Sequence, residues 1–316
     1  VMNDAPASSA FAPDETPEFS WHPPAESGIS IRFVEANGLR FEVAECGDAA
    51  SPRLALCLHG FPELHYSWRH QMPLLAARGY RVWAPNMRGY GASSRPDGVS
   101  AYRLDTLIDD VASLIDASGA RGVMLVAHDW GALVAWHFAI RKLRPITRLV
   151  IMNVPHPRCS EREIRTFSQL RKSWYIFLFQ LPWLPERMLT RNGAAAIKQI
   201  FIKDPLNKSL FQPDDRQIFA DAALRPGAMR AMVNYYRALM RTPDMRSIGA
   251  AMVHVPTLML WGENDVALSL RCTEGTGEWV PDLELVTFPG ISHWVQQDAP
   301  DAVNAAMTDW LDRRGG

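Results

Sequence analysis

The sequence has few cysteines, almost no excess charge and no long apolar run, and each shortage excludes a class of protein. Its 4 cysteines, in 316 residues, lack the spacing of a disulfide framework or of a zinc site. With 33 Lys and Arg against 34 Asp and Glu, the net charge is −1. We find neither the basic stripe of a nucleic-acid binder nor the basic amphipathic helix of an interfacial membrane protein, and no run long enough to span a membrane. A small, roughly neutral ligand and a reducing compartment, the cytoplasm, are therefore expected.

The first 28 residues differ in composition from the rest of the chain. They contain five prolines and several Ser, Asp and Glu, without a basic start or an apolar segment, so they do not read as a signal peptide. We expect residues 1–28 to form an extended arm.

From residue 29 onward, short β-rich runs alternate with helical patterns, as in a sheet covered by helices. Two of these runs, 54–58 and 123–127, are apolar on both faces, which is typical of the middle of a parallel sheet. Helical spacing predicts helices over about 66–78 and over 104–115. The other predicted strands lie at 29–35, 39–44, 81–84, 149–152, 256–261 and 285–288.

The strand pattern stops after residue 156 and returns at about 251. Between them helical spacing dominates, and aromatic residues and methionines are frequent. We interpret residues 157–250 as a helical cap inserted into a core formed by 29–156 and 251–316. The most apolar part of the cap carries Trp174, Phe177, Phe179 and Trp183, most of which we expect to pack in the cap's own core, the rest lining a pocket.

The segment AHDWG, at 127–131, lies between a buried strand and a helical pattern. It has the form of a nucleophile elbow, in which a strained strand-to-helix turn exposes the central side chain at the carboxyl edge of the sheet. Here that residue is Asp129, and the helix N-terminus that follows favours its ionised form. Taken alone, Asp129 could equally be a helix N-cap, for which Asp is a preferred residue.

Two further segments follow predicted strands at the same edge. HGFP, at 59–62, is either a tight turn or part of an oxyanion hole. In the second case the backbone N–H groups of Phe61 and Trp130 would be the donors.

His293 follows the last strand, where ligands bind in open α/β sheets. For the carboxylate that orients His293 we choose Asp265, with Glu263 as the alternative, because the fold uses the order nucleophile, acid, His. The stretch MNV at 152–154, where some relatives place the acid, offers no carboxylate.

Together these motifs resemble the α/β-hydrolase family from about residue 29 to 313. Within that family, HGFP with Asp129 in HDWG is similar to the epoxide hydrolases, as is RGYG at 88–91 with Ser and Pro soon after. Asn86 departs from the pattern, since many relatives carry Asp there, but it lies outside the triad. The resemblance implies an α/β-hydrolase fold with an inserted cap, and an enzyme that converts a small apolar epoxide and water to a vicinal diol without metal or cofactor.

The family pattern also implies two cap tyrosines that hydrogen-bond to the epoxide oxygen. Tyr175 in YIFLFQ and Tyr236 in NYYR match the family segments, whereas Tyr235 points to a different helix face and is expected to pack. In the mechanism that this implies, Asp129 forms an alkyl ester and His293, held by Asp265, activates the water that hydrolyses it. The residues expected to contact substrate are Phe61, Trp130, Phe179 and Trp294.

Two other functions stay open. A haloalkane dehalogenase would share Asp129 and could use Trp130 as a halide donor, but such enzymes commonly add an Asn at position 61 or a second cap donor, for which Trp174 could serve. Fluoroacetate-type dehalogenases usually carry Arg at 130, and an esterase would want Ser at 129. A non-catalytic binder of a small apolar ligand would share the fold without using its chemistry. The particular epoxide, the stereochemistry and the choice between monomer and homodimer are left open.

Overall fold

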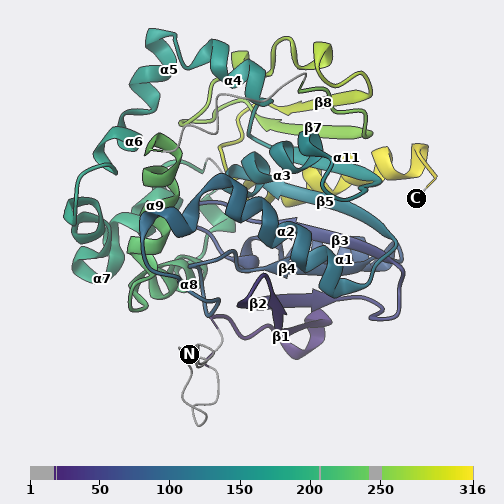
Figure 1. The fold of residues 1–316 in the computed structure, drawn as a ribbon, viewed down its shortest axis with the longest axis horizontal. Helices are drawn as coiled ribbons and strands as arrows, with labels where there is room; N and C mark the ends of the chain where they lie inside the picture. Colours follow the sequence, from purple (N-terminus) through teal and green to yellow (C-terminus); the bar gives the residue numbers. More distant parts are fainter. Residues whose placement is uncertain (1–17, 19, 206–207, 242–250, 316) are drawn as a thin grey trace, which may run out of the picture.

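The computed structural model describes residue 18 and residues 20–205, 208–241 and 251–315. Its centre is an eight-stranded sheet in the order β1-β2-β4-β3-β5-β6-β7-β8 (Figure 1). All neighbouring strands from β4 to β8 in this order are parallel, and the pairs β1·β2 and β2·β4 are antiparallel. The strands are β1 Ile29–Ala36, β2 Leu39–Cys46, β3 Arg53–Leu58, β4 Arg81–Pro85, β5 Gly122–His128, β6 Arg148–Met152, β7 Thr257–Gly262 and β8 Leu283–Phe288.

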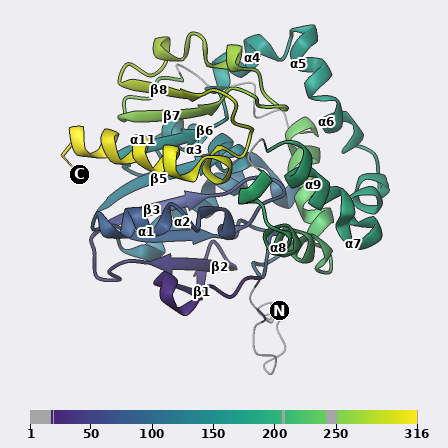
Figure 2. The same ribbon diagram turned by 180° about the vertical axis from the view of Figure 1, so that it is seen from behind.

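Helices cover both faces of this sheet, so its central strands are buried. Residues 54–58 of β3 and 123–127 of β5 are at most 2% exposed. On one face lie α2 (Leu104–Ser118) and α3 (Asp129–Arg141). On the other lies α11 (Pro300–Arg313), seen in front of the sheet in Figure 2, with α1 (Met72–Ala77) tied to it by a hydrogen bond from Gln71 to Asn304. The predicted parallel core is confirmed.

The predicted helix over 66–78 is wrong in its first half. The chain forms a 3-10 turn at His65–Trp68, and α1 begins only at Met72. Pro73 explains the late start, because proline lacks an N–H for the preceding turn and fits best in the first turn of a helix.

The insertion between β6 and β7 is helical, and among its described residues no strand occurs. It lies beside one end of the sheet in Figures 1 and 2. No helix in the described part of the chain has the length and apolarity needed to cross a membrane. The helices are α4 Pro157–Glu163, α5 Phe167–Lys172, α6 Trp174–Leu178, α7 Leu184–Lys203, α8 Pro213–Leu224 and α9 Ala228–Arg241.

Most of the predicted N-terminal arm, residues 1–17 and 19, lies outside the described residues. Near its end, Trp21 is 7% exposed and its ring packs on Tyr66 at 4.9 Å between centroids. The last part of the arm is therefore docked on the core.

Strand register brings the loops of the parallel strands to one edge of the sheet. Leu58 pairs with Ala127, Ala127 with Ile151, and Met152 with Leu260. Because these strands run parallel and end in register, the segments that follow them meet at the same place.

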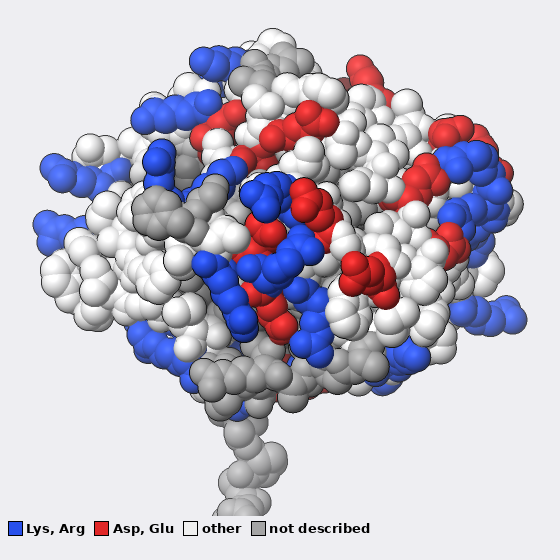
Figure 3. Space-filling model, turned by 90° about the horizontal axis from the view of Figure 1, so that it is seen from above, with Lys and Arg blue, Asp and Glu red and all other residues white. Residues whose placement is uncertain are grey.

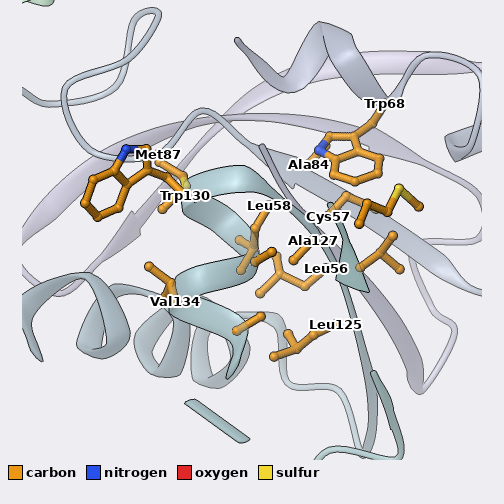
Figure 4. Packing of buried hydrophobic residues seen from close by; sticks show 14 of the residues in the cluster. Leu56, Cys57, Leu58, Trp68, Ala84, Met87, Leu125, Ala127, Trp130 and Val134 are labelled. Atoms are coloured by element: carbon orange, nitrogen blue, oxygen red, sulfur yellow. The ribbon is translucent and has the colours of Figure 1, made fainter. Parts of the chain in front are cut away.

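Close packing of α3 against β3 fixes the segment that follows β5. Figure 4 shows Val134 of α3 and Leu58 of β3 within one buried cluster, with Trp130 and Met87 at its margin. A Cβ at position 131 would lie 2.2 Å from the carbonyl oxygen of Leu58, so only glycine allows α3 to begin so near β3.

Candidate active site

Asp129 occupies the turn between β5 and α3 with a left-handed φ of 46°. This conformation costs a residue with a side chain about 1–3 kcal/mol, and such strain is concentrated at functional sites. The Oδ1 atom of Asp129 accepts a hydrogen bond of 2.6 Å from the N–H of Phe61. The N-cap position of α3 is His128, which makes no side-chain capping bond. The interpretation of Asp129 as an N-cap is therefore wrong, and its carboxylate is turned toward the HGFP loop.

The HGFP loop lies against this turn because Gly60 has no side chain. A Cβ on Gly60 would lie 2.2 Å from the Cβ of Asp129. The close approach directs the N–H of Phe61 at the Asp129 carboxylate, as required of an oxyanion donor. The N–H of Trp130 lies next in the chain, at the start of α3.

His293 lies between two carboxylates. Its Nδ1 is 2.7 Å from Oδ2 of Asp265, and its Nε2 is 3.4 Å from Oδ2 of Asp129. Asp265 also accepts hydrogen bonds from the N–H groups of Ala267 and Leu268, at 2.7 and 2.8 Å. Of the two acids considered from the sequence, Asp265 is the one placed against His293.

Asn153 adds a contact that the sequence alone did not indicate. It follows β6, within the stretch MNV at 152–154, which contains no carboxylate. Its Nδ2 donates to Oδ2 of Asp265 at 2.7 Å. Its Oδ1 accepts the N–H of Gly262 at 2.9 Å, which holds the amide in place. Asp265 is thus oriented by a neighbouring strand as well as by its own loop.

A second buried chain of contacts reaches the backbone of His293. Glu63, directly after HGFP, lies 2.7 Å from Nδ1 of His128, and Nε2 of His128 lies 2.8 Å from the carbonyl oxygen of His293. Gln296 and Gln297 donate to the other oxygen of Glu63, at 3.0 and 2.7 Å. This chain joins the loop after β3, the elbow and the loop after β8.

Asp129, Asp265 and His293 each stabilise the ionised form of a neighbour among the three. Burial alone would raise the pKa of Asp129, but His293 and the N–H of Phe61 lower it below its ordinary value. Burial likewise opposes ionisation of Asp265, whose pKa is nevertheless lowered by His293 and by its N–H donors. For His293, burial alone would lower the pKa, but Asp265 and Asp129 together raise it well above its ordinary value. Both carboxylates are therefore ionised at neutral pH.

Two tyrosines face Asp129 from the insertion. Tyr175 of α6 and Tyr236 of α9 line the same cavity as Asp129, and their ring centroids are 5.9 Å apart. Burial raises the pKa of both phenols, and the negative charge of Asp129 raises each further. Both hydroxyls are therefore protonated donors at neutral pH. Tyr235 packs in the interior instead, and its hydroxyl donates to the carbonyl oxygen of Arg88 at 2.8 Å.

The cavity has a volume of about 270 Å³ and is mainly apolar. Of the aromatic residues predicted to contact substrate, Trp130 lines it. Phe61 and Phe179 pack on Tyr236, at 5.4 and 4.9 Å between centroids, and Trp294 packs on His293 at 5.3 Å. Phe61 and Phe179 thus pack against Tyr236, and Trp294 packs against His293. Contact of these three aromatic residues with substrate stays a prediction. The apolar lining includes Leu133, Val154, Ile164, Ile176, Leu239 and Leu268.

The expectation that most cap aromatics pack inside is wrong for three of the four. Trp174, Phe177 and Trp183 are 61%, 53% and 66% exposed, and only Phe179 is buried. Trp174 does not line the cavity, so it does not provide a second halide donor beside Trp130. Within the described ranges, no group of three or more His, Cys, Asp or Glu could hold a metal ion.

Comparison with known proteins agrees with this geometry. Residues 55–300 match the alpha/beta hydrolase fold family. Over 284 residues the chain is 35% identical to human epoxide hydrolase 4, covering 88% of this chain and 77% of that protein. The chain belongs to the epoxide hydrolase family of α/β-hydrolases.

Solved structures of epoxide hydrolases share the whole architecture. A Bacillus megaterium epoxide hydrolase in complex with an inhibitor superposes with a TM-score of 0.81 at 28% identity, covering 89% of this chain and 100% of that one. The epoxide hydrolase VrEH1 from Vigna radiata gives 0.79 at 31% identity, covering 92% and 100%. The predicted α/β-hydrolase fold with an inserted helical cap is confirmed.

Proposed function

We propose that this protein is an epoxide hydrolase that adds water to a small apolar epoxide and releases a vicinal diol. One observation carries the proposal: an ionised carboxylate, Asp129, and two protonated phenols, Tyr175 and Tyr236, line one apolar cavity. Opening an epoxide requires a nucleophile at carbon and a proton donor at oxygen. Phenols suit the second task because they stay protonated at neutral pH.

In the first step, Asp129 attacks an epoxide carbon. Since Oδ1 is held by the N–H of Phe61, the attacking atom is Oδ2, on the His293 side. A bond forms from Oδ2 to carbon, the carbon–oxygen bond of the ring breaks, and the ring oxygen takes a proton from Tyr175 or Tyr236. General acid assistance of this kind contributes about 10²–10⁴-fold. The product is a hydroxyalkyl ester of Asp129.

Ester formation also changes His293. It removes the negative charge of Asp129, one of the two charges that raise the pKa of His293. The imidazolium proton can then pass to the phenolate left by the first step, so that tyrosine and histidine are both neutral. His293 becomes a base only when there is an ester to hydrolyse.

In the second step, His293 takes a proton from water, and the hydroxide attacks Cγ of Asp129. Negative charge then develops on Oδ1, which the N–H groups of Phe61 and Trp130 stabilise. Loss of one such donor typically costs about 10²–10³-fold in rate. The tetrahedral intermediate collapses, the carbon–oxygen bond between Cγ and the diol breaks, and the diol oxygen leaves with the proton from His293. The carboxylic acid formed on Asp129 then gives its proton to Nε2 of His293, which restores the carboxylate and the imidazolium.

Diol formation from styrene oxide tests this function, with bromide release from 1-bromobutane measured in parallel. We expect diol without bromide, and loss of diol when Tyr175 and Tyr236 are both replaced by Phe. Bromide without diol would make the protein a haloalkane dehalogenase. Neither product, across a set of apolar epoxides, would favour a non-catalytic ligand binder.

We also propose the division of the chain into a core, 29–156 and 251–316, and a cap, 157–250. The arrangement of α4 to α9 as one insertion supports these limits. The four buried free cysteines support a reducing compartment such as the cytoplasm.

A further inference from the structure

The outer margin of the cap carries a row of exposed apolar side chains. α5 and α6 follow each other almost without a break and form this margin in Figures 1 and 2. Leu170, Trp174, Phe177 and Leu181 succeed one another at intervals of three or four residues, and they are 41%, 61%, 53% and 45% exposed. Such spacing places Leu170, Trp174 and Phe177 on one side of the run of α5 and α6, and Leu181 follows just after its end.

The other side of the same run faces the interior of the protein. Ser173 is 6% exposed, and Tyr175 and Ile176 line the active-site cavity. A helical segment that is apolar on all sides is expected to be covered on all sides. Here only the inner side is covered by the described chain.

The exposed row belongs to a larger surface, which we call the cap ridge. Of the eleven exposed large apolar residues in the described chain, seven lie within residues 164–188. A cluster of exposed large apolar side chains is typical of a surface that binds a protein or a membrane. Ile164 lines the active-site cavity and is left out, so the cap ridge consists of Leu170, Trp174, Phe177, Leu181, Trp183 and Met188.

The exposed charged residues around the cap ridge are arginines. No Asp or Glu occurs from residue 164 to 185. The acidic side chains just outside this interval, Glu161, Glu163 and Glu186, each pair with an arginine. Figure 3 shows Lys and Arg side chains projecting at the left margin of the molecule, where the cap lies, with no Asp or Glu among them. The exposed charged residues between 162 and 193 are Arg162, Arg165, Arg171, Arg187 and Arg191.

We propose that the cap ridge is a peripheral membrane-binding surface for an anionic bilayer. Trp174, Trp183 and Phe177 enter the interfacial layer, where amphipathic aromatic rings are favoured, and the flanking arginines bind lipid phosphates. Charge decides between this partner and a second copy of the chain. A twofold dimer places a patch against itself, so it would bring two sets of arginines together.

The cap ridge could not be recognised from the sequence alone. A basic amphipathic helix is recognised by one apolar and one charged face, but here the apolar residues of α6 occupy both faces, and the arginines lie before and after the aromatic run. The proposal departs from the expectation, drawn from composition, that the protein does not bind a membrane surface.

The position of the ridge gives it a use in catalysis, a point that rests on the proposed function. Trp174 faces outward, while its neighbour Tyr175 lines the cavity, so one helix separates the bilayer from the site. The diameter of a helix with its side chains is about 10–12 Å. Apolar epoxides dissolve in lipid, and the cap would take them from there.

Co-sedimentation of the full chain with vesicles tests the surface independently of catalysis. Vesicles of phosphatidylcholine with phosphatidylglycerol are compared with phosphatidylcholine alone. We expect binding to the anionic vesicles. The double variant Trp174→Ser, Phe177→Ser should weaken it by at least about tenfold, because it removes two interfacial aromatic side chains. The double variant Arg165→Gln, Arg171→Gln should weaken it by about fivefold for each arginine.

The matched control is Leu285→Ser, because Leu285 is 39% exposed but lies on β8, away from the cap. It should bind vesicles as the wild type does, and circular dichroism of every variant verifies the fold. The proposal is overturned if the wild type does not bind anionic vesicles, or if the control loses binding as strongly as the ridge variants. It is also overturned if sedimentation velocity shows a dimer that only the ridge variants dissociate, without vesicle binding. Diol release is measured separately, so failure of the enzyme function would leave this result standing.

Discussion

The core half and the cap half of the active site are held by different forces. In the core, His293 lies 2.7 Å from Asp265 and 3.4 Å from Asp129, and strand ends in register fix all three residues. In the cap, Tyr175 and Tyr236 lie among aromatic rings, with Phe179 4.9 Å from Tyr236. The core half should therefore respond to loss of single polar atoms, and the cap half to loss of packing or of both hydroxyls.

The largest effect is expected from Asp129→Asn, because an amide is no nucleophile at this carbon. The rate of diol formation should fall by about 10⁴-fold or more, measured as kcat with styrene oxide. Glu161→Gln is the matched control, since Glu161 also lines the cavity but pairs with Arg158. An equal loss of kcat in the two variants would contradict the role of Asp129 as the nucleophile.

On the cap side, removing both hydroxyls in Tyr175→Phe, Tyr236→Phe should slow ring opening by about 10²–10⁴-fold. The rings remain, so the thermal midpoint should stay close to that of the wild type. Tyr235→Phe is the control: it removes only the bond to the Arg88 carbonyl, and should cost about 0.5–1.5 kcal/mol of stability without slowing the reaction. Full activity in the double variant would contradict the donor role.

Asn153→Leu tests how far the core half depends on one polar contact. It removes the hydrogen bond from Nδ2 to Asp265, and bonds to charged groups contribute about 1.5–3 kcal/mol, or about tenfold to a hundredfold in rate. We expect this loss in ester hydrolysis, with alkylation of Asp129 preserved. Rapid-quench kinetics separate the two steps, and equal slowing of both would indicate general damage to the site.

The pH dependence should separate the two steps as well. The pKa of Asp129 is lowered from 3.8, so its carboxylate stays ionised as the pH falls through the ordinary carboxyl range, and alkylation should persist there. Ester hydrolysis needs neutral His293 and should decline as the pH falls and His293 takes up a proton. Burst kinetics at acidic pH should show ester accumulating. A common decline of both steps would exclude this division of roles.

The smallest effect is expected at Asn86, which directly follows β4 and lies outside the triad. Its amide donates to Glu42 at 2.6 Å and to Ser20 at 2.9 Å. Burial alone would raise the pKa of Glu42, but His65, with the N–H groups of Ala92 and Ser20, lowers it to about 2. Asn86→Asp would place a second carboxylate there, which we expect to cost about 1–3 kcal/mol of unfolding free energy at pH 7.

This cost should diminish as the pH falls and the added carboxylate takes up a proton, because the pair then carries a single charge. Chemical denaturation at neutral and acidic pH measures the trend. A cost that does not change with pH would contradict a charge effect.

The core half could be predicted from the sequence because its signals are local. Runs 54–58 and 123–127 are apolar on both faces, and the chain order of Asp129, Asp265 and His293 matches the fold. Asn153 and Glu63 could not be found in this way, since their partners are separated from them by many residues and meet only through strand register. In the cap, the tyrosines were selected by family resemblance. Which side of the aromatic run is covered depends on packing, and so the exposure of Trp174 and Phe177 does not follow from the sequence.

The most direct test of the proposed chemistry is intact-protein mass spectrometry of the variant His293→Gln after incubation with styrene oxide. Without a base for the second step, the ester should accumulate, so the protein mass should increase by one whole epoxide, and peptide mapping should place it on Asp129. No adduct, an adduct on another residue, or turnover equal to that of the wild type would contradict the covalent mechanism.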